Sequence, residues 1–140
     1  MAGDQPKPLP GSLGDFVTYY GRELSRAERA VEREVFGSAA GINSYTTPAQ
    51  TELLADALRL RPGVQLLDVG SGSGWPALYL AQRTGCDAVL TDVPVAGIRS
   101  AAARASDRRL LGRCAFVAAS GTDLPFRSRS FDAVAHSDVL

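Results

Sequence analysis

The sequence contains few of the residues that bind metals. Its 140 residues include one histidine, His136, and two cysteines, Cys86 and Cys114, which stand 28 positions apart. Neither cysteine has another cysteine or a histidine at the spacing of a zinc site, so we expect no metal centre. Reduced and partly buried thiols are the expected state of both cysteines.

The chain also lacks long apolar runs and an excess of charge of either sign. No run approaches the length of a transmembrane helix, and the N-terminus has no apolar core of the signal-peptide type. Fifteen basic and fifteen acidic residues give a formal net charge of zero, which provides no overall attraction to nucleic acid or to an anionic membrane. We therefore expect a cytoplasmic protein with neither nucleic acid nor a membrane as its partner.

Lysine is almost absent, because Lys7 is the only one and arginine supplies nearly all the positive charge. One quarter of the chain holds six of the arginines: Arg104, Arg108, Arg109, Arg113, Arg127 and Arg129. They fit either a site for an anionic substrate or RNA, or a solvated helix end and loop. No aromatic residues interleave with them as a base-stacking surface would require, so the solvated surface is favoured.

The length of the chain is that of about one domain. Two helices are expected before the first strand. Residues 1–14 are rich in proline and glycine and are predicted to form a disordered tail. Ser25 and Glu28 form a capping box, which starts a helix that ends near Gly37. The apolar residues that make this helix amphipathic are Ala27, Ala30, Val31 and Val35.

The second helix has a start signal made of three parts. Thr47 is the expected N-cap, Pro48 occupies the first helical position, and Gln50 stands three residues after the cap. The helix is expected to stop before Pro62, because the residue before a proline is pushed out of the helical region. Its predicted buried stripe consists of Leu53, Leu54, Ala57, Leu58 and Leu60.

Residues 66–76, with the sequence LLDVGSGSGWP, join a buried strand to a glycine-rich turn. The alternating glycines Gly70, Gly72 and Gly74 remove Cβ where the chain turns and let backbone N–H groups approach a ligand closely. Ligands of open α/β sheets bind outside the carboxyl ends of the strands, where this loop lies. We expect the loop to hold a nucleotide, and a simple strand-to-helix turn is the alternative.

Short strands alternate with helices after this loop. The predicted strands are 88–90, 115–118 and 131–137, and the predicted helices are 76–83, ended by Gly85, and 94–105. Such alternation indicates βαβ units with right-handed crossovers, and hence parallel strands. The predicted fold class is therefore α/β, a Rossmann-like open parallel sheet with flanking helices.

Asp92 stands at the carboxyl end of the second predicted strand, 18 residues beyond Gly74. A carboxylate in this place accepts hydrogen bonds from both ribose hydroxyls of an adenosine. An aspartate before a helix that begins with a proline also serves as a simple N-cap. Its distance from the glycine loop favours the nucleoside ligand.

Two motifs together resemble one enzyme family. The spacing of Asp68 and the three glycines resembles the first motif of the class I methyltransferases that use S-adenosylmethionine. Residues 124–126 (LPF) and 130–134 (SFDAV) closely resemble the stretch that introduces the fourth strand in members of the type 11-like group, which act on small molecules. The resemblance implies S-adenosylmethionine as cofactor, a small-molecule methyl acceptor, and the strand order 3-2-1-4.

The resemblance also assigns the cofactor-binding residues, which are Asp68, Gly70, Gly72, Gly74, Asp92, Ser120 and Asp123. Family members usually carry an acidic residue at the position of Ser120, where it bonds the adenine amino group. A serine hydroxyl can accept the same bond, but without charge assistance the bond is weaker. Asp123 is the candidate substitute for the missing acid.

His136 and Asp138 are the candidate catalytic residues. They stand two apart near the end of the fourth strand, so their side chains are expected on the same face. Methyl transfer mainly requires the acceptor to be aligned with the methyl group, and His136 is a candidate base for the acceptor proton. A structural histidine is the alternative, and Asp138 is expected to face the sulfonium or the acceptor.

The resemblance predicts three parts: a tail at 1–14, an N-terminal helical segment and lid at 15–62, and a partial S-adenosylmethionine-binding domain at 63–140. Tyr45, Thr46 and Gln50 are candidates for the lid by resemblance, although loop and cap roles explain them equally well. The family's sheet has seven strands, so we expect a domain truncated after the fourth, with one sheet face free of helices. Pairing with another chain through the exposed fourth-strand edge is a further expectation.

Two other functions remain open. One is a cofactor-binding or interaction module without turnover, which the early terminus and Ser120 favour. The other is an NAD(P)-binding oxidoreductase, because Gly72, Gly74 and Ala77 also fit a G-x-G-x-x-A dinucleotide fingerprint. That fingerprint is common, and NAD domains require neither Asp68 nor the L-P-F loop, so the methyltransferase is favoured.

Overall fold

The computed structural model describes residues 14–15, 18–19, 22–36, 41–42 and 44–137. Its centre is a four-stranded parallel sheet with the order β3-β2-β1-β4, which confirms the predicted order. The strands are β1 (Gln65–Val69), β2 (Asp87–Asp92), β3 (Cys114–Ala118) and β4 (Ala133–His136). The tail predicted at 1–14 lies outside the described residues except for Gly14, which is helical.

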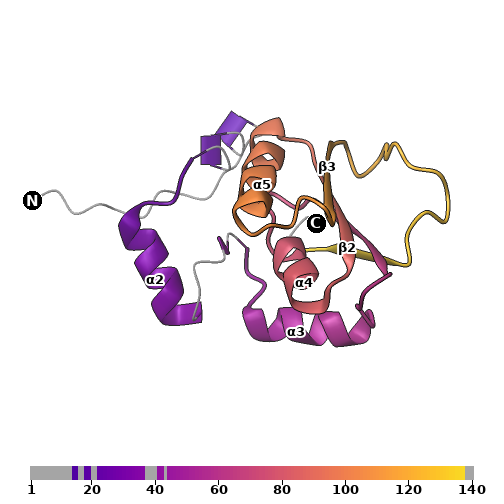
Figure 1. Ribbon diagram of the computed structural model, residues 1–140. Helices are drawn as coiled ribbons and strands as arrows, with labels where there is room; N and C mark the ends of the chain where they lie inside the picture. Colours follow the sequence, from indigo (N-terminus) through magenta and orange to yellow (C-terminus); the bar gives the residue numbers. More distant parts are fainter. Residues whose placement is uncertain (1–13, 16–17, 20–21, 37–40, 43, 138–140) are drawn as a thin grey trace, which may run out of the picture.

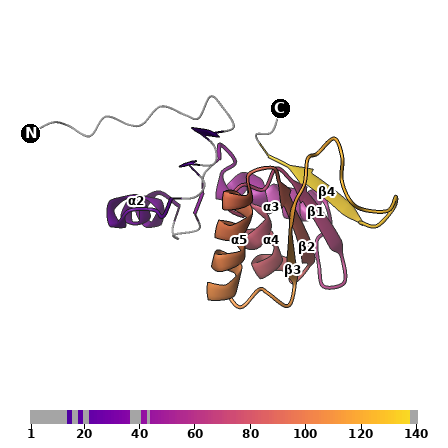
Figure 2. The same ribbon diagram turned by 90° about the horizontal axis from the view of Figure 1, so that it is seen from above.

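Three helices cover one face of the sheet, as expected (Figure 1, Figure 2). They are α3 (Pro48–Ala57), α4 (Ala77–Thr84) and α5 (Val95–Asp107). Gly85 ends α4 in the left-handed conformation, as predicted. Among the described residues no helix lies on the other sheet face, and none is long and apolar enough to span a membrane.

The core lies between the sheet and these helices. In register across the sheet, Leu66 of β1 stands beside Ala88 and Ala133, and all three are buried against the helices. Alternate residues point to the other face, where Val134 is 56% exposed. Both cysteines are free and buried in this core, and burial raises the pKa of Cys114 to about 11. One face of the sheet is therefore buried beneath the helices, and the other face is partly exposed to solvent.

The helix α2 (Arg26–Phe36) starts at the predicted capping box, because the Ser25 Oγ accepts from the Glu28 N–H and the Glu28 carboxylate accepts from the Ser25 N–H. The helix is amphipathic, as predicted, but its apolar side is not covered in the described part of the chain. Its predicted apolar residues are exposed, namely Ala27, Ala30, Val31 and Val35. Glu32 is the buried residue instead, and α2 stands apart from the helices that cover the sheet (Figure 1).

The helix α3 has the predicted N-cap and capping box at Thr47 and Gln50. Its predicted buried stripe is confirmed in part, because Leu60 is buried and Leu54 and Leu58 pack against the core. Thr51 and Ala55 are buried, whereas Leu53 is 69% exposed and Ala57 is also exposed. Polar contacts also join α3 to α4. The Tyr79 hydroxyl donates to Glu52, and Arg83 forms an ion pair with the same carboxylate at 3.4 Å.

Two leucine substitutions test this assignment of the core. Leu80 of α4 is fully buried, so Leu80→Ala should lower the free energy of unfolding by about 2 to 5 kcal/mol through lost burial and a cavity. The matched control Leu53→Ala, at a position predicted to be buried but found exposed, should change it by no more than about 0.5 kcal/mol. Denaturant unfolding measures both, and equal losses would contradict the described packing of α3.

Candidate functional site

The glycine loop between β1 and α4 is tied to the end of β2. The backbone N–H groups of Gly70 and Ser71 both donate to the Thr91 carbonyl, at 2.8 and 2.9 Å. The Thr91 hydroxyl in turn donates to the Asp68 carbonyl at 3.0 Å. The turn after β1 is thus held against the neighbouring strand by three hydrogen bonds.

Glycine is required by the backbone of this loop. Gly70, Gly72 and Gly74 have φ values of 78°, 52° and 108°, in the region that residues with a Cβ rarely adopt. At Gly74 an added Cβ would also lie 2.5 Å from the Cδ1 of Leu78, in the first turn of α4. The loop is therefore a buried stretch of backbone that residues with a Cβ could not form without strain.

The carboxylate of Asp92 points to the same loop. Its Oδ2 accepts a hydrogen bond from the Gly72 N–H at 2.6 Å, and its Oδ1 accepts one from the Val93 N–H at 2.7 Å. An ionised carboxylate has about four acceptor positions, so roughly two remain for a ligand. The glycine turn of one strand and the acidic end of its neighbour thus meet at one point.

Asp68 lies beneath this point and is only 1% exposed. Neither of its carboxylate oxygens has a hydrogen-bond partner in the described part of the chain, and the same holds for the buried Ser71 hydroxyl. Burial, with a smaller contribution from the charge of Asp92, raises the pKa of Asp68 to about 7. Unpartnered buried polar groups with a shifted pKa are characteristic of functional sites.

The loop after β3 approaches Asp92 from the other side. The Ala119 N–H donates to the Asp92 carbonyl at 3.0 Å, so the turn that begins at Ser120 lies beside the acidic end of β2. The Ser120 hydroxyl contacts the Thr122 hydroxyl at 2.8 Å, and the Asp123 N–H donates to the Ser120 carbonyl. Ser120 is half-buried near the site, whereas Asp123 is exposed at the end of this turn.

A segment before α3 crosses toward the glycine loop, through contacts that the sequence did not predict. The Trp75 indole N–H donates to the Thr46 carbonyl at 2.9 Å, and the Thr46 hydroxyl is hydrogen-bonded to the Ser137 hydroxyl. Tyr45 is exposed beside them, and Gln50 is engaged in the cap of α3. Thr46 therefore joins the glycine loop to the end of β4, residues that no local sequence pattern connects.

His136 is the last residue of β4 and stands beside Val69 in register. Its side chain is exposed and leaves the sheet on the face without described helices, opposite to the buried Ala135. It is thus near the carboxyl edge of the sheet but is not among the residues that surround Asp92. Asp138 lies outside the described residues.

Comparison with known proteins identifies the family. Residues 66–140, more than half of the chain, match a protein family described as "Methyltransferase domain". The chain belongs to the class I S-adenosylmethionine-dependent methyltransferases. It is 36% identical over 142 residues to the ubiquinone/menaquinone biosynthesis C-methyltransferase UbiE of Rhizobium leguminosarum bv. trifolii, a match that covers 91% of this chain and 55% of that protein. It is also 36% identical over 110 residues to the nocamycin O-methyltransferase of Saccharothrix syringae, with 74% and 39% covered.

Solved structures share the fold. An S-adenosylmethionine-dependent methyltransferase from Geobacter sulfurreducens, in complex with S-adenosyl-L-homocysteine, superposes with a TM-score of 0.63 at 25% identity, over 84% of this chain and 45% of that one. The [4+2]-cyclase SpnF superposes with a TM-score of 0.59 at 35% identity, over 61% and 32%. The chain spans about half the length of the UbiE relative. Family membership decides against the NAD(P)-binding alternative.

The buried carboxyl of Asp68 makes folding stability depend on pH. Because the pKa of Asp68 is raised from 3.8 to about 7, its burial costs little below pH 4, and the free energy of unfolding falls as the pH rises from about 4 to about 7 and then levels off. Asp68→Asn removes this loss. The free energy of unfolding of the variant, relative to that of the wild type, should therefore rise between pH 4 and pH 8 by up to about 4 kcal/mol. Chemical denaturation at both pH values measures the gain.

Asp92→Asn provides the control for this pH effect. The Asp92 charge is the second cause of the raised pKa of Asp68, so removing that charge should move the pH midpoint of the stability loss downward. If instead the wild type and Asp68→Asn differ equally at pH 4 and pH 8, Asp68 is not the titrating group.

Proposed function

We propose that this chain binds S-adenosylmethionine between the glycine loop and Asp92 and takes part in methyl transfer to a small molecule. The observation that carries this proposal is the hydrogen bond from the Gly72 N–H to the Asp92 carboxylate. It brings a backbone surface without side chains to the same place as an acceptor group with free positions. An adenosine needs both, since it presents a flat ring, two ribose hydroxyls and a linked chain.

The residues present fit this cofactor. The two acceptor positions left on Asp92 match the two ribose hydroxyls in number. We infer that Ser120, which follows Ala119 at the Asp92 carbonyl, accepts a bond from the adenine amino group, with exposed Asp123 as its candidate substitute. The unpartnered carboxyl of Asp68 would favour the cationic end of the cofactor, because a nearby positive charge stabilises a buried carboxylate.

When bound, the cofactor supplies a methyl group made electrophilic by a sulfonium. The protein then has to align an acceptor and to exclude water. We propose that the segment from Tyr45 to Thr47 serves this purpose as part of a lid at 15–62, because Thr46 is bonded both to Trp75 of the loop and to Ser137 after β4. His136, at the adjacent end of β4, and Asp138 remain the proposed groups for moving the acceptor proton.

The acceptor is proposed to be a small molecule. The related proteins include methyltransferases named for ubiquinone/menaquinone biosynthesis, for 24-methylenesterol and for nocamycin. Turnover has to be measured separately from binding, because one relative at 35% identity is a [4+2]-cyclase. Transfer of a labelled methyl group to small molecules with phenol, enol or alcohol groups would establish the activity. Cofactor binding without transfer to any of them would favour a module without turnover.

Calorimetric titration with S-adenosylhomocysteine tests the cofactor site. Gly72→Val should abolish binding, since the side chain would fill the cofactor's space and strain a backbone at φ 52°. Asp92→Ala should weaken binding through the loss of hydrogen bonds to a charged group, worth roughly 1.5 to 3 kcal/mol each.

Matched controls separate these effects from damage to the fold. Gly112→Val, at a glycine with open space around its Cα, and Asp56→Ala, at an exposed residue of α3, should leave the affinity unchanged. Unchanged affinity in both Gly72→Val and Asp92→Ala would remove the proposed site.

Ser120 allows a gain of affinity to be tested. Ser120→Asp should tighten S-adenosylhomocysteine binding by roughly three- to tenfold, because a carboxylate makes a stronger bond to the adenine amino group than a hydroxyl does. Ser120→Ala should weaken it, and Ser130→Ala, an exposed serine in the same loop, is the control. The same affinity for all three variants would show that Ser120 does not contact the adenine.

A further inference from the structure

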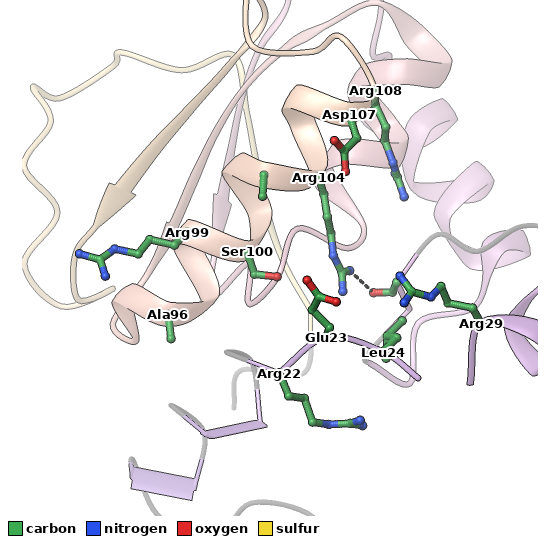
Figure 3. Close-up of a pocket in the computed structure, with 12 residues that line it drawn as sticks. Arg22, Glu23, Leu24, Arg29, Ala96, Arg99, Ser100, Arg104, Asp107 and Arg108 are labelled. Carbon is green, nitrogen blue, oxygen red and sulfur yellow. Dashed lines mark hydrogen bonds between the residues drawn. The ribbon is translucent and has the colours of Figure 1, made fainter. Parts of the chain in front are cut away.

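A cavity of about 630 Å³ lies between α5 and the segment that contains Arg22 and α2, apart from the glycine loop (Figure 3). Small residues of α5, Ala96, Ser100 and Ala103, recur along one side of the helix and line the cavity, and Gly41 lines it from the other side. Volumes of about 300 to 1,000 Å³ are usual for small-molecule sites. The cavity is therefore large enough for a ligand of its own.

The lining is rich in arginine. The lining contains two acidic residues, Glu23 and Asp107, and five arginines. The arginines are Arg22, Arg29, Arg99, Arg104 and Arg108. Arg22 is neutralised by an ion pair with Glu28 at 2.7 Å. Within the described ranges, no ion pair to a carboxylate forms at Arg29, Arg99 or Arg104. The buried carboxylate of Glu32 acts on Arg104 and Arg108 and offsets one more positive charge, so the cavity keeps a small excess of positive charge.

Arg104 and Arg108 are half-buried, which corrects the interpretation of these two arginines as solvated surface. Arg104 reaches from α5 toward the N-terminal segment and donates to the Gly41 carbonyl at 3.1 Å, the dashed bond in Figure 3. Burial, followed by the charge of Arg108, lowers the pKa of Arg104, and the nearby Glu32 carboxylate offsets this only in part. A guanidinium has five N–H donors, so donors remain for a ligand.

We propose that this cavity is a binding site for a small anionic molecule, whose carboxylate or phosphate is held by Arg104 and Arg108. The anion would accept charge-assisted hydrogen bonds from the two guanidinium groups and relieve the repulsion between them. A second, small cavity, which Arg104 and Gly41 also line, extends to Ser73 of the glycine loop. Arg104 and Gly41 thus stand between the arginine-lined cavity and the smaller one, and the anionic group lies apart from the glycine loop.

Calorimetry of the whole chain with inorganic pyrophosphate, and separately with citrate, tests the proposal. We expect saturable binding of at least one of them with one site per chain, and the preferred anion distinguishes phosphate from carboxylate recognition. Arg104→Gln should weaken this binding about tenfold or more, because charge-assisted bonds are lost. Arg104→Lys should give a smaller loss, since it keeps the charge but not the planar set of donors.

Three controls make the result decisive. Arg127→Gln, at an exposed arginine outside the cavity, should bind the anion as the wild type does. Circular dichroism would reveal whether Arg104→Gln disturbs folding. If it does, Arg108→Gln is the second variant that should lower the affinity for the anion. Affinity for S-adenosylhomocysteine should be unchanged in Arg104→Gln, so this test does not depend on the proposed cofactor site.

Three outcomes would overturn the proposal. The first is the absence of saturable binding of both anions up to roughly 10 mM, which is too weak for a built site. The second is an equal loss in Arg127→Gln, which would mean that anions bind the surface at large. The third is competition between the anion and S-adenosylhomocysteine, which would assign the arginines to the carboxylate of the cofactor.

Discussion

The site depends on three successive backbone N–H groups that turn toward the end of one strand. Those of Gly70 and Ser71 donate to the Thr91 carbonyl, and that of Gly72 donates to the Asp92 side chain. Gly70 and Gly72 reach this arrangement with φ values of 78° and 52°, which glycine adopts without strain. The same bonds fix the end of β1 against β2, so the fold and the proposed cofactor surface are set by one local arrangement.

This arrangement has a cost that the rest of the domain must offset. The tight turn leaves the Asp68 carboxyl and the Ser71 hydroxyl buried without hydrogen-bond partners in the described chain, and such groups are unfavourable by about 1 to 3 kcal/mol each. The compact apolar layer of α4, β1 and β2, which includes Leu66, Leu80 and Leu90, surrounds them. A ligand that supplies charge or hydrogen bonds at this point would recover part of that free energy, so binding and folding are coupled.

Local patterns were sufficient to predict the strands and the two capping boxes, because caps and βαβ units are set by neighbouring residues. The sheet order, in contrast, was implied by the resemblance to the methyltransferase family. Local patterns also placed Asp92 at the end of the strand that follows the glycine loop. They failed where contacts join distant segments. Helix periodicity carries no information about the burial of Glu32, the burial of Thr51 in α3 or the bond between Trp75 and Thr46. These features depend on side chains that lie far along the chain.

Two parts of the described structure, the helices that cover the sheet and the segment before α3, are stabilised by different kinds of contact. The helices α3, α4 and α5 meet the sheet through buried apolar side chains, whereas the segment before α3 is joined by polar contacts, namely Trp75 to Thr46 and Arg104 to Gly41. Each such contact contributes only about 0.5 to 1.5 kcal/mol net, and the valines of α2 remain exposed. The described part of this segment is therefore joined to the rest of the domain by fewer stabilising contacts than the helices that cover the sheet.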